Sequence, residues 1–313
     1  MAASEASLSR RRLKSAAAAR ARVTSSQHFT GWAFVTPGVA IILLFGAVPV
    51  VWSAVMSFQR NNLLSSDTPY VGLHNYRTLV HDPVVAQAVE HTLVYTALFV
   101  PGSMIVGLFL AVAMNRNVRF INFYRTAAYA TMAISTISEA LVFIWLFDPS
   151  YGIVNYFFSL IGIPQQEFLN SPSEALYVIV VMTIWGWTGF AVIIYLAALQ
   201  GIPQDLTEAA AIDGCSRWAG FRRITLPLLS PASLFLAVWL TINALQLFDE
   251  VYLSTQGGPL NATTVLVYYL YEQAFQNFKF GYASAIAYLL FIVILVVTAI
   301  QFRIGRRYTY YRS

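Results

Sequence analysis

The sequence carries little charge for its length and almost no cysteine. Asp, Glu, Lys and Arg together make up 11% of its 313 residues, whereas soluble domains carry about 25%. Its one cysteine, Cys215, excludes a disulfide within the chain and a metal site built from several cysteines. The signature G-x-x-x-x-G-K-[ST] is also missing, and no glycine is followed by lysine. A phosphate-binding loop of that type is therefore excluded.

Hydrophobic residues take the place of the missing charge. They make up 58% of the chain, and the mean hydropathy is +0.62. A run of about 18 or more apolar residues can cross the hydrocarbon core of a bilayer as a helix, in which every backbone polar group finds a partner. We therefore expect an all-α membrane protein with six transmembrane helices. The six runs are residues 31–58, 92–114, 127–147, 175–199, 228–248 and 284–304.

The positive charges predict which way the helices run. The leading tail holds six Lys and Arg residues, the trailing tail four, and the connections at 115–126 and 200–227 three each, so 16 of the 19 fall on one side. Arg60, Arg77 and Lys279 are left for the other side. Because cytoplasmic segments are enriched in Lys and Arg, both termini and the 200–227 loop should be cytoplasmic. The net charge of +5 reflects this bias and does not indicate nucleic-acid binding.

These expectations divide the chain into four parts. Residues 1–28 are rich in Arg, Ser and Ala and should form a disordered basic cytoplasmic tail beside the anionic lipid. Residues 29–87 should hold the first transmembrane helix and an outer loop. Residues 88–305 should form the transmembrane core, and residues 306–313 a second cytoplasmic tail.

The 200–227 loop has the start and stop signals of two short helices. Asp205 and Glu208 favour the positive end of a helix dipole. Gly214 is typical of the position just past a helix end, where φ is positive. Ser216 can cap a second helix that runs through Ile224, and Pro227 ends the loop. The loop should therefore be a rigid helix pair beneath the membrane. Three of its side chains are available to acidic partners or phosphates: Arg217, Arg222 and Arg223.

The same loop resembles the signature loop of bacterial ABC importer permeases. It reads, in order, Glu208-Ala209-Ala210, three residues, Gly214, nine residues, and Ile224-x-Leu226-Pro227. Further segments typical of sugar and glycerol-phosphate uptake permeases are residues 71–76, 213–214, 221–227, 253–259 and 281–285. Over residues 30–305 the chain resembles type I permeases, in particular the first permease of the maltose and glycerol-3-phosphate systems. It departs from their pattern at Cys215, where Ala is usual, and at Glu139, inside the third run.

The resemblance implies a division of labour among several subunits. This chain would be a non-enzymatic transport subunit of the bacterial cell membrane that carries a sugar or glycerol-phosphate solute. A second homologous permease would complete the pathway, two cytoplasmic subunits would bind ATP and Mg²⁺, and an extracytoplasmic protein would deliver the substrate. The residues expected to couple this chain to the ATPases are Glu208, Ala209, Ala210, Asp213, Gly214, Arg217, Ile224, Leu226 and Pro227.

Polar residues within the fifth run are candidates for the substrate pathway. Asn243, Gln246 and Glu250 have the spacing i, i+3 and i+7, which gives them one helical face. Polar side chains within a membrane often mark such a pathway. Amide side chains at a helix interface more often hold neighbouring helices together, so that interpretation stays open.

Three more candidates lie in the third and fourth runs. Trp185 and Trp187 can stack on sugar rings, or serve only in packing and interface anchoring. Glu139 can accept hydrogen bonds from hydroxyl groups, face a cationic group, or pair with Arg125 or a partner subunit. A carboxylate in a membrane segment is costly, which makes it a functional candidate.

Two other classes of protein fit the sequence less well. A secondary transporter usually shows inverted repeats or broken helices and needs no polar helix pair on one side. A multispan membrane enzyme needs a catalytic constellation, and we find none. The four histidines lie outside the apolar runs or at their edges: His28, His74, His81 and His91.

Overall fold

The computed structural model describes residues 30–61, 67–115 and 119–308. The predicted basic tail at 1–28 lies outside these residues, as do residues 309–313 of the second predicted tail. Within the described ranges all regular elements are helices, apart from one isolated bridge between Gln59 and Tyr70. The chain divides into two compact units between Met56 and Ser57.

The first unit is a single apolar helix, which continues to Ser57. It begins at Thr30, is 28 residues long with a mean hydropathy of 2.4, and has no buried residue in its most apolar window. A π-helical turn, Leu43–Ala47, precedes the α-helical segment α2, Val48–Ser57. The turn ends two residues before Pro49, whose missing N–H interrupts the regular hydrogen-bond ladder. This helix matches the predicted run at 31–58.

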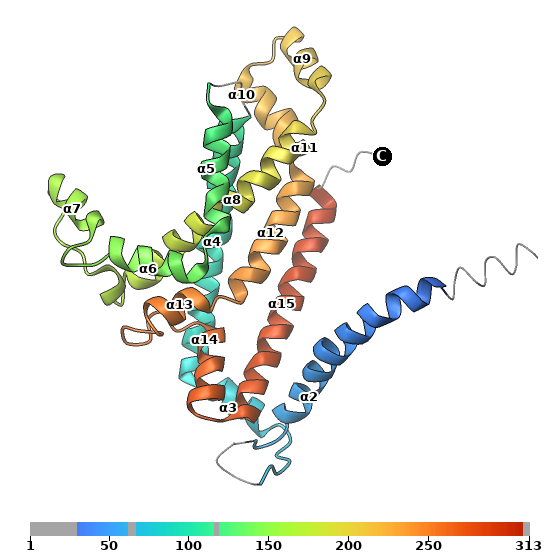
Figure 1. Cartoon of the computed structure of the whole chain (residues 1–313), viewed down its shortest axis with the longest axis vertical. Coiled ribbons are helices and arrows are strands. Elements are labelled where there is room, and N and C mark those ends of the chain that lie inside the picture. The colour runs from blue at the N-terminus through green and yellow to red at the C-terminus, as the bar shows by residue number, and fades with distance from the viewer. Residues whose placement is uncertain (1–29, 62–66, 116–118, 309–313) are drawn as a thin grey trace, which may run out of the picture. The chain divides into compact units, whose positions relative to one another are not determined.

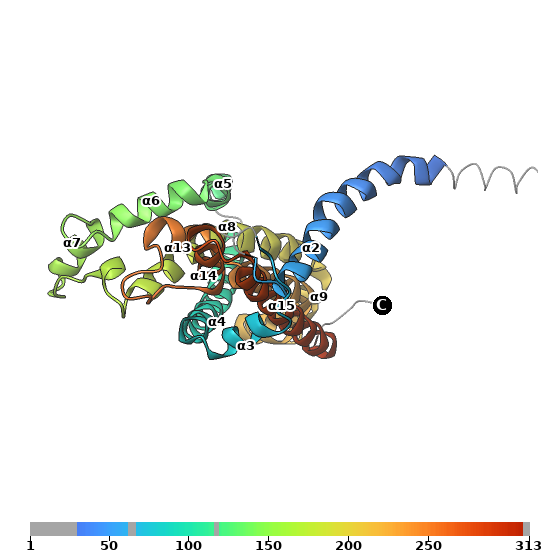
Figure 2. The same cartoon turned by 90° about the horizontal axis from the view of Figure 1, so that it is seen from below.

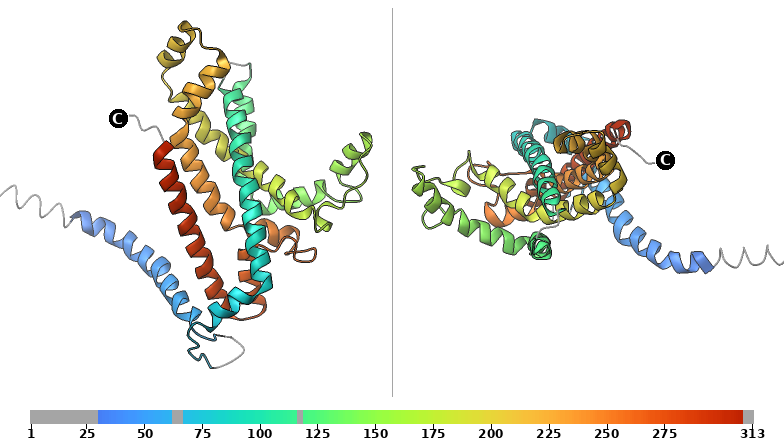
Figure 3. Two further views of the ribbon diagram at one scale, coloured as in Figure 1. Left: turned by 180° about the vertical axis from the view of Figure 1, so that it is seen from behind. Right: turned by 90° about the horizontal axis from the view of Figure 1, so that it is seen from above.

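The second unit is a bundle in which α4, α8, α12 and α15 are the main helices (Figures 1 and 3). Its first half contains α3 His74–His81, α4 Pro83–Met114, α5 Ile121–Ala133, α6 Thr136–Leu146, α7 Ile153–Leu160, a 3₁₀ turn at Phe168–Asn170, and α8 Ala175–Gln200. Its second half contains α9 Gln204–Ile212, α10 Arg217–Gly220, α11 Leu226–Leu228, α12 Ser230–Leu245, α13 Asp249–Ser254, α14 Leu266–Tyr271 and α15 Phe280–Tyr308, with π turns at Phe221–Thr225 and Glu272–Gln276.

Helix α4 begins well before the predicted run at residue 92. Pro83 stands in its first turn, where a missing N–H costs nothing. The Asp82 carboxylate caps the helix by accepting a hydrogen bond from the Val84 N–H at 2.9 Å. The polar pair Glu90 and His91, which directly precedes the predicted run, therefore lies inside the helix.

Two of the six predicted spans are bent rather than straight. The pair α5 and α6 meets at 102°, and the helical segments Arg217–Leu228 and Ser230–Leu245 meet at 62°. The first bend falls where Ile134 and Ser135 both adopt extended backbone, with ψ of 131° and 140°. Counting described helices that are long and apolar enough gives four spans, or six if each bent pair is one span. The all-helical membrane class is confirmed, and the predicted number of six spans is reached only if each bent pair is counted as one span.

The tightest packing in the bundle is between α4 and α8. Gly107 on α4 lies so close to Ala191 on α8 that a Cβ added to the glycine would collide with the alanine side chain. Small residues at such a crossing let two helices approach closely, which is how helices associate in a membrane. The buried residues Tyr195, Leu196 and Leu236 extend this contact towards α12.

Candidate functional site

The predicted helix stop at Gly214 is present in the structure. Helix α9 ends at Ile212, and Gly214 follows with a φ of +75°. The Cys215 N–H donates to the Ala210 carbonyl at 2.9 Å, and the Asp213 N–H donates to the Ala209 carbonyl at 3.0 Å. A hydrogen bond across six residues with a left-handed glycine is the Schellman motif, which closes a helix end sharply. The loop therefore turns at Gly214 with a fixed geometry.

The second helix of the loop starts as predicted but does not continue as predicted. The Ser216 hydroxyl caps α10 by accepting from the Ala219 N–H at 3.3 Å. However, α10 ends at Gly220, and a π-helical turn from Phe221 to Thr225 replaces the expected α-helix through Ile224. Pro227 cannot donate a backbone hydrogen bond, which favours a widened turn just before it.

Several large apolar side chains of the helix pair are exposed. Ile212 is 86% exposed and Trp218 is 70% exposed, and Leu206 and Leu226 are also exposed. The Trp218 ring stacks on Phe221, with ring centroids 5.8 Å apart. Such a patch of apolar side chains at one end of a molecule is typical of an interaction surface. Exposed cations surround it: Arg217, Arg222 and Arg223.

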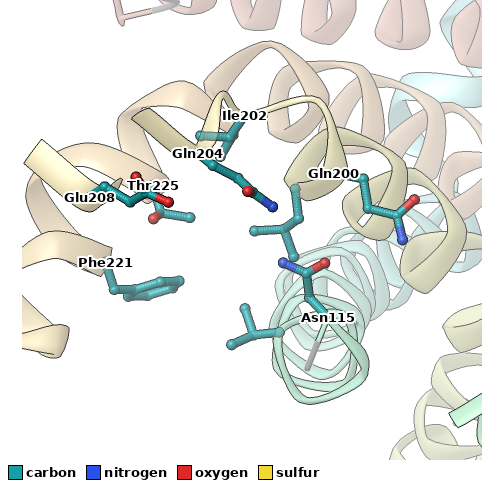
Figure 4. Close-up of a pocket in the computed structure, with 9 residues that line it drawn as sticks. Asn115, Gln200, Ile202, Gln204, Glu208, Phe221 and Thr225 are labelled. Carbon is teal, nitrogen blue, oxygen red and sulfur yellow. The ribbon is translucent and has the colours of Figure 1, made fainter. Parts of the chain in front are cut away.

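A cavity of about 570 Å³ lies between this loop and the ends of two long helices. Figure 4 shows Glu208 beside Thr225, with Phe221 from the π turn on the same side. Across the cavity lie Asn115, after α4, and Gln200, at the end of α8. The remaining lining residues are Val112, Leu199, Ile202 and Gln204. The sequence reasoning missed the amides, although their position at the ends of apolar runs was the available signal.

The predicted coupling residues lie in one segment, and they differ in how far they are exposed to solvent. Glu208 lines the cavity, and Ile224 in the π turn and Pro227 in α11 are half-buried. The other six do not line the cavity, and all but the half-buried Ala210 are exposed: Ala209, Ala210, Asp213, Gly214, Arg217 and Leu226.

A second, smaller cavity of about 170 Å³ gathers most of the predicted pathway residues. Asn243, Gln246 and Glu250 all line it, but they do not share one helical face. Helix α12 ends at Leu245, and α13 starts only at Asp249. The chain leaves the helix at Gln246, whose φ of −104° is outside the helical range. The cavity is therefore formed around a helix break.

Aromatic rings form the other walls of this smaller cavity. Trp187 lines it, with its ring 6.4 Å from Phe99 and 5.8 Å from Phe190 between centroids. Trp185 does not line it, and packs against Phe143 at 5.6 Å. Tyr95, Phe99 and Thr136 also line it, and their distance along the chain from α12 gave no signal. Leu247, Phe248 and Asp249 line it as well, and they were missed because the helix break that places them was not expected.

Glu139 is buried on α6 rather than in the wall of the cavity. It is 7% exposed, and its Oε1 atom has no hydrogen-bond partner among the described residues. The carboxylate covers Gly186 of α8, where an added Cβ would come within 2.5 Å of either oxygen. Arg125 does not pair with it, since its guanidinium donates to the Met114 carbonyl at 3.0 Å. Helix α6 packs against α13, which carries Glu250.

The chain matches one family model over most of its length. Residues 103–310 match the family model described as "Binding-protein-dependent transport system inner membrane component". The lactose transport system permease protein LacF of Rhizobium radiobacter is 34% identical over 284 residues, which is 88% of this chain and 94% of that protein. The sn-glycerol-3-phosphate transport system permease protein UgpA of Brucella abortus is 31% identical, over 93% of this chain and 99% of that protein.

A solved structure has a similar fold. It belongs to a bacterial alginate ABC transporter in complex with an alginate pentasaccharide-bound periplasmic protein. The matched chain is 26% identical with a TM-score of 0.79, over 90% of this chain and 96% of that chain.

Proposed function

This chain belongs to the family of binding-protein-dependent transport system inner membrane components, and we propose that it forms half of the translocation pathway of an ATP-driven importer. As a member of that family it is a membrane-embedded permease subunit of an ABC importer. A second, homologous permease would form the other half. An apolar hollow of about 700 Å³ on α6 and α7, lined by Leu141, Trp145 and Ile153 among others, supports a contact with such a partner.

The segment from the start of α9 to the end of α11, called the 204–228 loop below, would couple the permease to two cytoplasmic ATPases that bind ATP and Mg²⁺. The observation that carries this proposal is the exposed side chain of Ile212 at the end of a helix fixed by Gly214. Burying that side chain in an ATPase would contribute about 2 kcal/mol to assembly. The bend before α12 would then carry the movement of the ATPases into the bundle.

Replacing Ile212 with Glu tests the coupling contact. We expect the I212E subunit to lose its ATPase partner during purification of the complex, because a charge in an apolar contact is costly. Leu260 offers a matched control, since it is also 86% exposed but lies in the loop between α13 and α14. The L260E subunit should retain the ATPase. Equal retention in both variants would contradict the proposed contact.

The native cysteine tests the proposed orientation. Cys215 is the sole cysteine of the chain and is partly exposed in the loop. In intact cells a membrane-impermeant maleimide should leave it unlabelled, whereas in inside-out vesicles it should react. A C215A variant, which has no thiol, measures the background labelling. Labelling in intact cells would place the loop on the outer side and overturn the orientation.

The cargo we propose is a sugar or a glycerol-phosphate type of solute, delivered by an extracytoplasmic binding protein. The smaller cavity supports this class, because the Trp187 ring and the side chains of Asn243 and Gln246 suit stacking on sugar faces and hydrogen bonding to hydroxyl groups. Glu139, Trp185 and Glu250 remain proposed members of the pathway.

Replacing Gln246 with Ala tests the pathway. This side chain is exposed to the cavity and makes no hydrogen bond within the described residues, so its loss should not affect folding. We expect a KM for uptake about tenfold higher, with normal assembly with the ATPases. An unchanged KM would remove Gln246 from the pathway.

A further inference from the structure

A third cavity, of about 380 Å³, lies at the end of the second unit opposite the 204–228 loop. Viewed from below, α3, α14 and the start of α15 come together at this end (Figure 2). The lining is polar and contains two cations, Arg60 and Lys279. The other lining residues are Asn61, His74, Asn75, Thr78, Asp82, Tyr269, Gln273 and Tyr282.

Backbone hydrogen bonds hold the two cation-bearing segments together. The Arg60 N–H donates to the Pro69 carbonyl at 2.9 Å, and the Gly281 N–H donates to the Asn61 carbonyl at 3.2 Å. The Lys279 N–H donates to the Gln273 carbonyl at 2.8 Å. The segment that follows the first helix is thereby tied to the start of α15. The two charges are kept at one site although they lie far apart in the sequence.

Asp82 is the one acidic residue that lines the cavity, and both of its carboxylate oxygens accept hydrogen bonds from within the chain. Its Oδ2 accepts hydrogen bonds from the hydroxyl groups of Tyr269 at 2.7 Å and Tyr282 at 2.6 Å, and its Oδ1 caps α4. Partial burial raises the pKa of the Asp82 carboxyl, but these hydrogen bonds outweigh burial and leave it lowered. Among the described residues no acid forms an ion pair with Arg60 or Lys279. The cavity therefore has an excess of positive charge.

A side-chain amide also lines this cavity. Gln273 is 6% exposed, its amide forms no side-chain hydrogen bond within the described part of the chain, and its polar atoms are not fully enclosed by protein. The amide is therefore available to donate to, or accept from, a ligand or water in the cavity. The N-terminus of α15 adds a further positive contribution, because a helix of 29 residues has a strong dipole. Two cations, an amide and a helix N-terminus are the groups that bind phosphate.

We propose that this cavity binds a phosphate group, either the phosphodiester of a lipid headgroup or free inorganic phosphate. Helices α4 and α15 both begin at this end, at Pro83 and Phe280, and both are long and apolar enough to cross a membrane. The first residues of such helices lie at the depth of the headgroups. The cavity is therefore at the level where lipid phosphates are found. The proposal does not depend on the cargo or on the ATPase contact.

The test compares three preparations of the full-length chain, purified with its partner subunits. One is reconstituted with phosphatidylglycerol, one with the phosphate-free lipid galactosyldiacylglycerol, and one with that lipid plus inorganic phosphate. The pocket variant is R60A/K279A. The matched control is R77A, because Arg77 is an exposed cation on α3 that does not line the cavity. Native mass spectrometry counts bound phospholipid, and thermal unfolding measures stabilisation by either ligand.

We expect wild type and R77A to retain phosphatidylglycerol and to be stabilised by it, and R60A/K279A to bind it about tenfold more weakly. Stabilisation by inorganic phosphate alone would identify free phosphate as the ligand. A Q273L variant with native charges should also bind more weakly, which separates the site from a diffuse surface charge. Equal binding by wild type and R60A/K279A would overturn the proposal. An equal loss in R77A would overturn it as well.

Discussion

The 204–228 loop and the opposite end of the second unit use polar and apolar groups in contrasting ways. At the loop end, Ile212 and Trp218 lie in the open and a large cavity separates the helix pair from α4 and α8. At the opposite end, Asp82 fastens α4 to α14 and α15 through two short hydrogen bonds. One end thus has apolar surface available for a partner, and the other has its elements joined within the chain.

The contrast separates two requirements of a transport subunit. A surface that meets an ATPase through a cycle needs contacts that form and break, and apolar patches supply these without fixed partners. The far ends of the helices need a constant arrangement, and charge-assisted hydrogen bonds supply direction as well as energy. The predictions below test whether the two ends differ in this way.

The largest effect should come from Gly214. A β-branched side chain at its φ of +75° costs about 1–2 kcal/mol, so G214V should reshape the turn after α9. We expect ATP-driven uptake to fall to background in reconstituted complexes, with ATP hydrolysis either lost or uncoupled from uptake. The measurement is solute uptake per ATP hydrolysed.

Gly162 provides the control for that substitution. It follows α7 with a φ of +77°, and like Gly214 it has open space where a side chain would stand. The Ile163 N–H donates to the Phe158 carbonyl at 3.0 Å, so the turn has the same form. G162V should bear a similar local strain but keep the coupling ratio. If the two variants lost coupling equally, the effect would be one of strain and not of position.

A smaller effect is expected at the opposite end. D82N removes the charge that accepts hydrogen bonds from Tyr269 and Tyr282, and it should lower the free energy of unfolding by about 1–2 kcal/mol, since the site is partly open to water. Thermal or denaturant unfolding in detergent measures this difference. ATPase retention should stay normal, because the 204–228 loop is untouched. Loss of the ATPase in D82N would mean that the two ends are not independent.

The same carboxylate predicts a dependence on pH. Its folded-state pKa is lowered, so its stabilising contribution is complete above the unfolded value of about 4 and is lost as the pH falls through the folded value. The stability gap between wild type and D82N should be constant from pH 7 to about pH 5 and should shrink as the pH falls below about 4. A gap that did not shrink with falling pH would show that the carboxylate charge is not its source.

The smallest effect should come from the cap of α10. The Ser216 hydroxyl accepts a long hydrogen bond of 3.3 Å from Ala219, so S216A should cost about 0.5 kcal/mol. We expect a modest drop in coupled uptake, measured as for G214V. A loss as large as that in G214V would assign the rigidity of the loop to its cap rather than to its glycine.

The features that were predictable from the sequence are those fixed by local chemistry. The apolar runs gave the helices, since span length is set by membrane thickness, and the residues around Gly214 and Ser216 gave the stop and start of the loop helices. These signals act over a few residues and do not depend on which segments pack against the helix.

The features that were missed depend on packing between distant segments. Nothing local marks the 102° bend, because neither proline nor glycine stands between Ile121 and Leu146. The bend lets α6 pack on α13, which no spacing rule encodes. The start of α4 was missed for a different reason. Asp82 and Pro83 are ordinary helix start signals, but the predicted run counted apolar residues only and therefore began after Glu90 and His91.

The close approach of Gly107 to Ala191 has a mechanical consequence. Two helices that touch backbone to backbone leave no room to slide or rotate past each other, so α4 and α8 should move as one rigid body. Any change of shape in the second unit then has to pivot elsewhere. The breaks at Ile134 and Leu229, where the chain already departs from a straight helix, are the points at which we expect it to turn.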